Sequence, residues 1–410
     1  AHSWRRDCLT GVIARDTTWS GDTVRFAGDI LVPEGVTLTI DPGCVVQFQG
    51  YGGIEVQGRL LAVGEPGDPI RFRSRDPEAF EPDSSTTGAW SGICFPRPPA
   101  SAQSRLEWCE IAYAKGLDGF GLGGALHLEG FSNLVVRNCV FHHNLAQYGG
   151  VLYCSHNSSP RISGCVMTAN YALTGGSAIY ALDSYPRIDA TTIADNAVLN
   201  EGTAYDTGAI HNQMSKTEVW SSILWGNTSS YFGQVQMREP KSRYVTFSDI
   251  EGGFKGAGNL DVTPRFLGAG EHPYDLAVDS PCVGAGDPDT TGRCLPMFDP
   301  AGRPRIAQER IDAGAYEWTD PSNVAWGQDE GGPGDHRGHA DARLAVRPNP
   351  AARTVAIFFR LERPSSLTVV ISDPSGRMVA RPGEGWYAAG AHTLLWDGRD
   401  RSGRPVPAGM

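Results

Sequence analysis

The sequence predicts an all-β protein in which a solenoid of short stacked strands is followed by a small β-sandwich. A repeat of 26 residues runs through the middle of the chain, which is the mark of a stacked architecture. Apolar residues alternate in short runs that Gly, Pro, Asn and Ser interrupt, as in strands joined by turns. Glycine supplies 51 of the 410 residues and proline 28, and 40% of the chain is hydrophobic, which is enough for a sizeable core.

Short runs in the first third of the chain open the predicted solenoid. Residues 36–40, 44–48 and 54–57 alternate between apolar and polar side chains, and turn-forming Pro-Glu-Gly, Asp-Pro-Gly and Tyr-Gly-Gly punctuate them. Glycine pairs then begin at Gly123, Gly149 and Gly175 and carry the 26-residue period. Heptad spacing and the leucine-rich pattern are both missing, so we expect coils of about three strands stacked at roughly 4.8 Å.

Two sets of residues recur with the coils. Asparagines fall at one turn, where we favour hydrogen bonding within the turn over a polar binding stripe: Asn144, Asn170, Asn196 and Asn227. Cysteines fall at a second position, where we expect small core residues, with disulfides between coils left open: Cys109, Cys139 and Cys165. The nine cysteines of the chain form no CxxC pair and no zinc spacing.

These segments resemble a known group of proteins. ILVPEGVTLTIDPGCVVQF, IEVQGRLLAVGEPGDPIRF and WSGICF look like the opening coils of secreted bacterial right-handed parallel β-helix proteins. The repeats GG-x-x-[HY] and C-x-x-x-x-N are similar to those of polymorphic outer-membrane proteins and the pectate-lyase-like superfamily, and SPCVGAGDP and RIDAGAYEW resemble their closing segments. The resemblance implies a right-handed parallel β-helix with an N-terminal cap over residues 1–318, but that superfamily contains lyases, hydrolases and adhesins alike.

The composition changes after residue 318. Residues 319–342 are rich in Gly and Asp and predict a flexible linker. Alternating runs at 355–361, 367–372 and 392–396 then predict a small β-sandwich over residues 343–410. Asn349-Pro350, Ser375-Gly376-Arg377 and Trp396-Asp397-Gly398 resemble the immunoglobulin-like domains of flagellar hook-capping proteins and of type IX secretion sorting modules. In that family a strand follows the glycine that here is Gly409, so we expect an open edge that accepts a donated strand.

Charge and hydropathy limit the classes of partner that we expect for this protein. The net charge of −11 argues against nucleic acid or an anionic membrane as the main partner. Since no run approaches eighteen apolar residues, we expect no transmembrane helix. The chain starts at Ala1, as a secreted protein does once its signal peptide is removed, which together with the resemblance predicts an extracellular or bacterial cell-surface location.

A column of aromatic residues is the first candidate ligand-binding site. It occupies the third strand position of successive repeats and, with Leu or Ile before each member, is expected to face outward: His127, Tyr153, Tyr180 and His211. Such rings could stack against sugars, with Glu129, Asp183 and Gln213 as hydrogen-bonding neighbours. The alternative is an aromatic ladder that only stiffens the sheet.

A basic stripe is the second candidate. Arg161 and Arg187 share one repeat position and Arg137 fits it loosely, so this stripe either holds an acidic polysaccharide or solvates a face. The acidic residues of the repeats do not fall at a common repeat position, so the sequence indicates no pair of catalytic carboxylates. His142 and His143 are adjacent and are expected to point in different directions, which argues against a shared metal.

A loop near the end of the solenoid offers a possible cation site. Asp287, Asp289 and Asp299 could hold calcium, although the full calcium-loop pattern is missing, so the cofactor is either none or calcium. Cys282 and Cys294 bracket part of this loop and are the best disulfide candidate.

Two functions therefore stay open. The favoured one is a secreted or surface-displayed rigid element that binds polysaccharide or a surface partner, or assembles end to end. The alternative is a polysaccharide lyase or glycoside hydrolase, whose acids and bases would converge from distant coils.

Overall fold

The computed structural model describes residues 9–199 except 22, then 208–229, 233–234, 237–238, 244–293, 295–306, 310–319, 342–347, 355–361, 365–372, 378–387, 390–396, 399 and 404. Two compact units form, Ala1–Trp318 and Thr319–Met410. The all-β prediction is confirmed: the described residues are almost entirely strands and turns, with one short 3-10 helix, η1 (Pro77–Ala79), and a further residue, Tyr244, in 3-10 conformation. Of the predicted linker at 319–342, residues 320–341 lie outside the described part.

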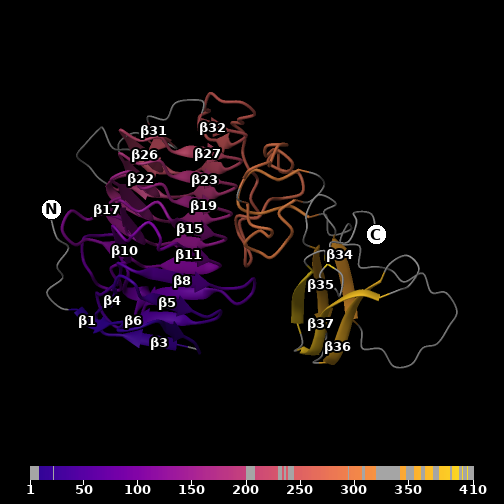
Figure 1. Ribbon diagram of the computed structural model, residues 1–410. Coiled ribbons are helices and arrows are strands. Elements are labelled where there is room, and N and C mark those ends of the chain that lie inside the picture. The colour runs from indigo at the N-terminus through magenta and orange to yellow at the C-terminus, as the bar shows by residue number, and fades with distance from the viewer. Residues whose placement is uncertain are drawn as a thin grey trace. The chain divides into compact units, whose positions relative to one another are not determined.

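The first unit is a parallel β-helix, as predicted (Figure 1). Each coil contributes one strand to each of three long parallel sheets, here named A, B and C. Sheet A contains β1 (Leu9–Val12), β4 (Asp29–Val32), β7 (Ile54–Val56), β10 (Ile93–Pro96), β14 (Leu126–Glu129), β18 (Leu152–Ser155), β22 (Ile179–Leu182), β26 (Ile210–Gln213) and β31 (Met237–Arg238). Sheet B contains β2 (Thr17–Trp19), β5 (Thr37–Ile40), β8 (Arg59–Val63), β11 (Ser104–Glu107), β15 (Leu134–Arg137), β19 (Arg161–Ser163), β23 (Arg187–Asp189), β27 (Glu218–Trp220) and β32 (Val245–Thr246).

Sheet C and a shorter sheet D complete the coils. Sheet C contains β3 (Thr23–Phe26), β6 (Val45–Phe48), β9 (Ile70–Ser74), β12 (Cys109–Ala112), β16 (Val140–His142), β20 (Val166–Thr168), β24 (Thr192–Ala194), β28 (Ile223–Trp225) and β33 (Asp249–Ile250). Sheet D contains β13 (Lys115–Gly116), β17 (Leu145–Tyr148), β21 (Tyr171–Gly175), β25 (Ala197–Val198), β29 (Thr228–Ser229) and β30 (Gly233–Gln234), of which β29 and β30 pair antiparallel.

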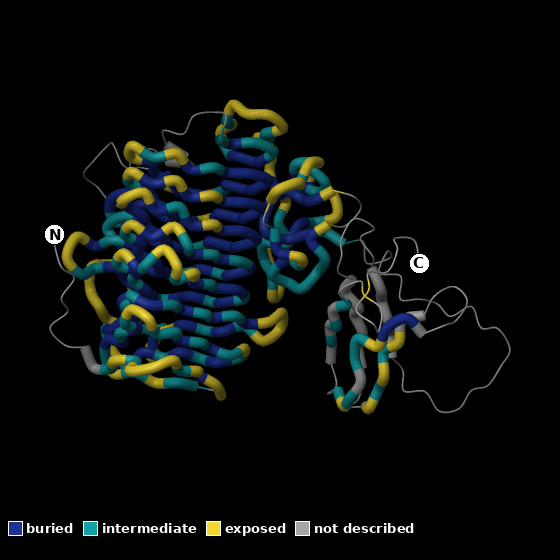
Figure 2. The backbone as a smooth tube through the Cα atoms, viewed as in Figure 1, coloured by how far each residue is buried: buried dark blue, intermediate teal, exposed yellow. Residues whose placement is uncertain are grey.

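Alternation within the strands separates the core from the surface. In β5, for example, Leu38 and Ile40 are fully buried while Thr37 and Thr39 are half-buried. Stacking these strands joins the inward residues of all coils into one continuous hydrophobic core, and Figure 2 shows the exposed residues gathered mainly at the turns. This is the period-2 pattern that the sequence carries.

The chain turns its corners through residues in the left-handed backbone conformation. Between sheets B and C, one residue of each middle coil has φ from 45° to 65°: Trp108, Asn138, Gly164, Ala190 and Ser221. Between sheets C and D, the equivalent residues are Tyr113, His143, Ala169, Asp195 and Gly226. A non-glycine residue in this conformation costs on the order of 1 kcal/mol, so something else must stabilise each corner.

Ladders of hydrogen bonds between coils stabilise these corners. At the C–D corner the side-chain oxygen of each asparagine accepts the backbone N–H of the coil before it, at 2.9–3.1 Å along Asn144, Asn170, Asn196 and Asn227. At the B–C corner the acceptors are sulfur and hydroxyl groups at 3.1–3.5 Å: Cys139, Cys165, Thr191, Ser222 and Ser248. The buried cysteines are thus hydrogen-bond acceptors in free-thiol form rather than merely apolar filling.

After β33 the chain returns along the outside of the coils. This return segment, residues 263–318, bonds to the B–C corner through Gly314 N to Ser221 O (2.8 Å) and Asn138 Nδ2 to Phe298 O (3.0 Å). Its interior holds a fully buried ion pair between Arg305 Nη1 and Glu317 Oε1 (3.1 Å). Burial raises the pKa of Glu317 well above its usual value, against the opposing charge of Arg305.

The second unit is antiparallel. One sheet has the order β34 (Ala342–Arg347), β35 (Val355–Leu361) and β38 (Gly390–Trp396), and the other pairs β36 (Ser365–Ser372) with β37 (Met378–Tyr387). Two small antiparallel sheets agree with the predicted immunoglobulin-like fold class.

Substitution of one asparagine of the C–D ladder tests its contribution to stability. Asn170→Ala removes the acceptor of the Asn144 N–H and the donor to Phe141 O, both in the interior. We expect the free energy of unfolding to fall by roughly 3 kcal/mol, because buried groups lose their partners. Urea denaturation measures this. Asn157→Gly, at an exposed residue with φ of 62°, is the control and should change stability by less than about 1 kcal/mol. Equal effects of both changes would refute the ladder's role.

Stability should also depend on pH through Asp249, which lies in β33 and is fully buried. Burial raises the pKa of Asp249 to about 6, so the folded state binds this proton more tightly than the unfolded state. Its contribution to stability is present below about pH 4 and is lost as the pH rises through about 6. We therefore expect Asp249→Asn to gain up to about 3 kcal/mol relative to the unsubstituted protein between pH 4 and pH 7.5, measured by denaturation. If the difference in unfolding free energy between Asp249→Asn and the unsubstituted protein stayed constant across this range, Asp249 would not be the group responsible. Asp183→Asn, at an exposed corner, is the matched control.

Candidate functional site

The predicted aromatic column forms, but it is buried. His127, Tyr153, Tyr180 and His211 lie in register on β14, β18, β22 and β26, and each is only 5–6% exposed. Tyr180 stacks on Tyr153 and on His211 with ring centroids 5.6 and 4.6 Å apart, so the rings cover one another's faces. Tyr148 of sheet D packs edge-on against Tyr180 at 4.9 Å. The column points away from the core, but it presents no open ring face to a sugar.

The two carboxylates expected beside this column lie at the corner after sheet A. Glu129 pairs with Arg97 (Oε1 to Nη2, 2.7 Å) and lies 3.8 Å from His156 Nδ1. Asp183 is exposed and has a left-handed φ of 45°. Gln213, the third residue expected there, is a partner of the column: its Oε1 accepts a hydrogen bond from the Tyr180 hydroxyl at 2.7 Å.

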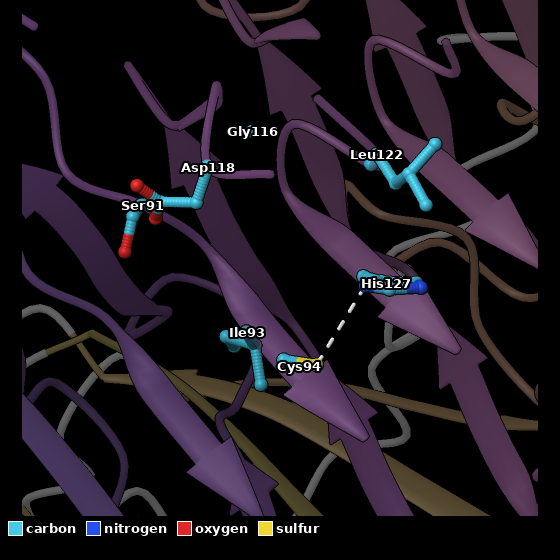
Figure 3. Close-up of a pocket in the computed structure, with 8 residues that line it drawn as sticks. Ser91, Ile93, Cys94, Gly116, Asp118, Leu122 and His127 are labelled. Carbon is cyan, nitrogen blue, oxygen red and sulfur yellow. Dashed lines mark hydrogen bonds between the residues drawn. The ribbon is translucent and has the colours of Figure 1, made fainter. Parts of the chain in front are cut away.

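A small pocket opens at the β10–β14 end of the column (Figure 3). It holds about 250 Å³ of open space, and its lining comes from sheet A and from the turns at sheet D: Ser91, Ile93, Cys94, Gly116, Asp118, Leu122, Gly123 and His127. Cys94 and His127 face each other across neighbouring strands, with Sγ and Nδ1 3.7 Å apart. Cys94 is not among the residues predicted from the sequence, because it lies before the repeats become regular.

A second cluster brings His142 and His143 together, against the prediction that they diverge. Their Nδ1 atoms are 3.0 Å apart, because His143 has a φ of 53° that turns its side chain back toward its neighbour. His142 Nε2 bonds Glu110 Oε1 at 3.1 Å, and Arg71 pairs with the other Glu110 oxygen. Hydrogen bonding to His142 and, less strongly, the charges of His142 and Arg71 lower the pKa of Glu110. With the two nitrogens bonded to each other, the pair is not arranged to chelate a metal.

The aspartates predicted to hold calcium have other partners. Asp287 Oδ2 accepts the Trp220 indole N–H at 2.7 Å, and the Asp289 carboxylate accepts the Thr291 N–H at 2.9 Å. Asp299 is fully buried and bonds Arg303. In the part of the chain that the structure describes, no three His, Cys, Asp or Glu side chains are grouped to hold a metal ion.

The predicted disulfide partner Cys282 is a buried free thiol that donates to Asp249 Oδ2 at 3.3 Å. It is therefore not joined to Cys294, which itself lies outside the described residues. Cys282 belongs to the contact between the return segment and the last coil, where Asp249 provides a strong acceptor.

The outer face of sheet B is a charged surface of the coils. Its outward positions carry arginines from successive strands: Arg59, Arg105, Arg137, Arg161 and Arg187. Arg161 and Arg187 are register partners and both are exposed, which places like charges side by side. Three carboxylates lie among them: Glu107 near Arg105 and Arg137, Glu218 near Arg187, and Asp189. The arginines outnumber them, so this arginine face is locally basic on an acidic protein.

The return segment closes one end of the arginine face. Arg293 lies over the Trp220 ring at 4.5 Å and pairs with Asp189 at 3.6 Å. Burial raises the pKa of Asp189 to about 6 despite this neighbour. The face therefore runs from Arg59 along the coils and ends against Arg293.

The fold defines a class of protein: a parallel β-helix followed by an immunoglobulin-like domain. Residues 349–410 match the family model of the FlgD Ig-like domain, a stretch that contains β35 to β38. No curated protein matches the chain, and neither does any solved structure. Within the described residues we find no helix with the length and apolar character needed to cross a membrane.

Truncating the buried column tests whether it serves stability rather than binding. Tyr180→Ala removes a ring that is 5% exposed and packs between two others, so we expect unfolding free energy to fall by about 3–5 kcal/mol. Thermal denaturation measures this. Tyr185→Ala, at a ring that is 38% exposed, should cost under about 1 kcal/mol. If Tyr180→Ala kept its stability but no longer bound a neutral glycan, the column would be a binding site instead.

Proposed function

We propose that this protein is an extracellular or cell-surface binding element whose arginine face holds an acidic polysaccharide along the axis of the β-helix. The observation that carries the proposal is the exposed register pair of Arg161 and Arg187 in a row of outward arginines. Like charges side by side repel each other; Glu218 offsets part of this repulsion at Arg187, and a bound polyanion would neutralise the pair further.

The spacing of the coils supports a polymer as the ligand. Neighbouring strands are about 4.8 Å apart, and Arg161 and Arg187 are register partners at that spacing. Arg105 lies in the same register row two coils before Arg161, with Val135 between them, and Arg137 lies in the neighbouring row. A guanidinium binds a carboxylate or sulfate through two parallel hydrogen bonds. A polymer with a charge on each sugar would engage several arginines at once, and each weak contact would add to the affinity.

The second unit would attach this element to its place of action. Its match to the FlgD Ig-like domain supports a role in export or attachment rather than in recognition of the glycan. The arginine face of the first unit would then bind the glycan, and the Ig-like domain of the second unit would anchor the chain.

Affinity electrophoresis tests the proposal. The purified chain should be retarded in gels that contain polygalacturonate or alginate, but not in gels that contain dextran, and salt should weaken the retardation. Arg161→Ala with Arg187→Ala should weaken binding about tenfold or more, since two charged contacts are lost.

A matched double variant provides the control. Arg97→Ala with Arg265→Ala removes the same charge from exposed side chains away from the arginine face and should leave the retardation unchanged. An equal loss of retardation in both double variants would show that binding depends only on the net charge of the protein. If the polymer in the gel were shortened, the protein would be a lyase or hydrolase rather than a binding element.

A further inference from the structure

The pocket at Cys94 and His127 supports an inference independent of the polysaccharide. Both residues lie on sheet A, opposite each other on β10 and β14, so backbone hydrogen bonds between the coils hold them in register. Figure 3 shows the two side chains next to each other, with Sγ and Nδ1 3.7 Å apart. This is a fixed pair of donors, because neither strand can slide without breaking the ladder.

The His127 ring has left the aromatic stack. Tyr153, Tyr180 and His211 lie nearly parallel, with interplanar angles of 15° and 17°. His127 is instead turned by 75° relative to Tyr153, which directs its Nδ1 edge toward Cys94. An imidazole nitrogen and a thiolate sulfur are both metal ligands, and here the two atoms lie side by side.

Cys94 is also the accessible thiol. Among the cysteines in the described residues it alone is partly exposed, and the others are buried: Cys44, Cys109, Cys139, Cys154, Cys165 and Cys282. The pocket in front of it is lined by Ser91, Asp118 and two glycines and has space for about one water molecule.

The distance between the two donors limits the metal. With bonds of about 2.3 Å to sulfur and about 2.0–2.1 Å to nitrogen, a separation of 3.7 Å corresponds to a sulfur–metal–nitrogen angle of about 115–120°. The two atoms form a hydrogen bond at this distance, and the angle accommodates a three- or a four-coordinate ion, so the choice of metal rests on the number and chemistry of the donors. Thiolate and imidazole together favour a soft ion, and zinc would need two more protein or solvent donors.

We propose that Cys94 and His127 bind Cu(I), with the third position filled by a water molecule in the pocket. Binding releases the thiol proton to solvent and forms one copper–sulfur and one copper–nitrogen bond, with no change in oxidation state. The site is distinct from the arginine face, which lies on sheet B.

Competition with bicinchoninate under anaerobic conditions tests the site on the full chain. The unsubstituted protein should hold one more Cu(I) than Cys94→Ser, and His127→Phe, which keeps a ring in the column, should weaken that site at least tenfold. Cys8 and Cys294 are retained in all three proteins, so any copper that they bind cancels in the comparison. His156→Gln, at the neighbouring corner, is the matched control and should bind as the unsubstituted protein does.

X-ray absorption at the copper edge gives the second measurement. It should show one sulfur and one or two nitrogen or oxygen neighbours, with the sulfur lost in Cys94→Ser. Circular dichroism and thermal denaturation confirm that the variants are folded. The same copper content and affinity in Cys94→Ser and in the unsubstituted protein would overturn the proposal, and so would a folded His127→Phe that binds as tightly.

Discussion

The structure depends on one constraint: every coil must turn its corners at the same place in the stack. Parallel strands hydrogen-bond only in register, so a coil that turned one residue early would invert the faces of its next strand. The corners need a left-handed residue, which is costly, and they leave backbone N–H groups that the strand ladders do not reach. Side chains of the following coil accept those N–H groups along Asn144 to Asn227 and along Cys139 to Ser248. The thiol of Cys165 and the hydroxyl of Thr191 act at equivalent positions, which explains why cysteine can alternate with threonine and serine without forming disulfides.

Once the register is set, the stacking of the coils decides which outward side chains are neighbours, and their separation along the chain no longer matters. Arg161 and Arg187 are 26 residues apart in sequence but adjacent on sheet B, and Cys94 faces His127 across 33 residues. A β-helix is therefore well suited to displaying rows of like side chains, which favours extended ligands over compact ones. The same rigidity holds two metal donors at a constant separation. The arginine face and the Cys94–His127 pair use this property on different sheets.

Some surface features could not be predicted from periodicity, and the reasons are local. The aromatic column was expected to be open to solvent because alternation turns it away from the core, but sheet D and the turns around it bring Tyr148 against Tyr180. Alternation describes which side of a strand a residue occupies and not what covers that side. His142 and His143 were expected to diverge, and the left-handed conformation at His143 brings them together. Asp287 and Asp299 were grouped by nearness in sequence, whereas Trp220 and Arg303 engage them separately.

The sequence by itself determined the class of fold, the length of a coil and the residues that recur at each corner. It could do so because a solenoid repeats the same local environment, and a repeated environment selects the same residue types at a constant period. Tertiary structure alone decided which outward residues stay exposed, which acids are buried and which thiol is accessible. Several of these properties depend on the return segment, which contacts the coils once and without a period. Contacts of that kind leave no repeating signal in the sequence, so Cys94, Asp249 and Trp220 acquire their roles only from the folded chain.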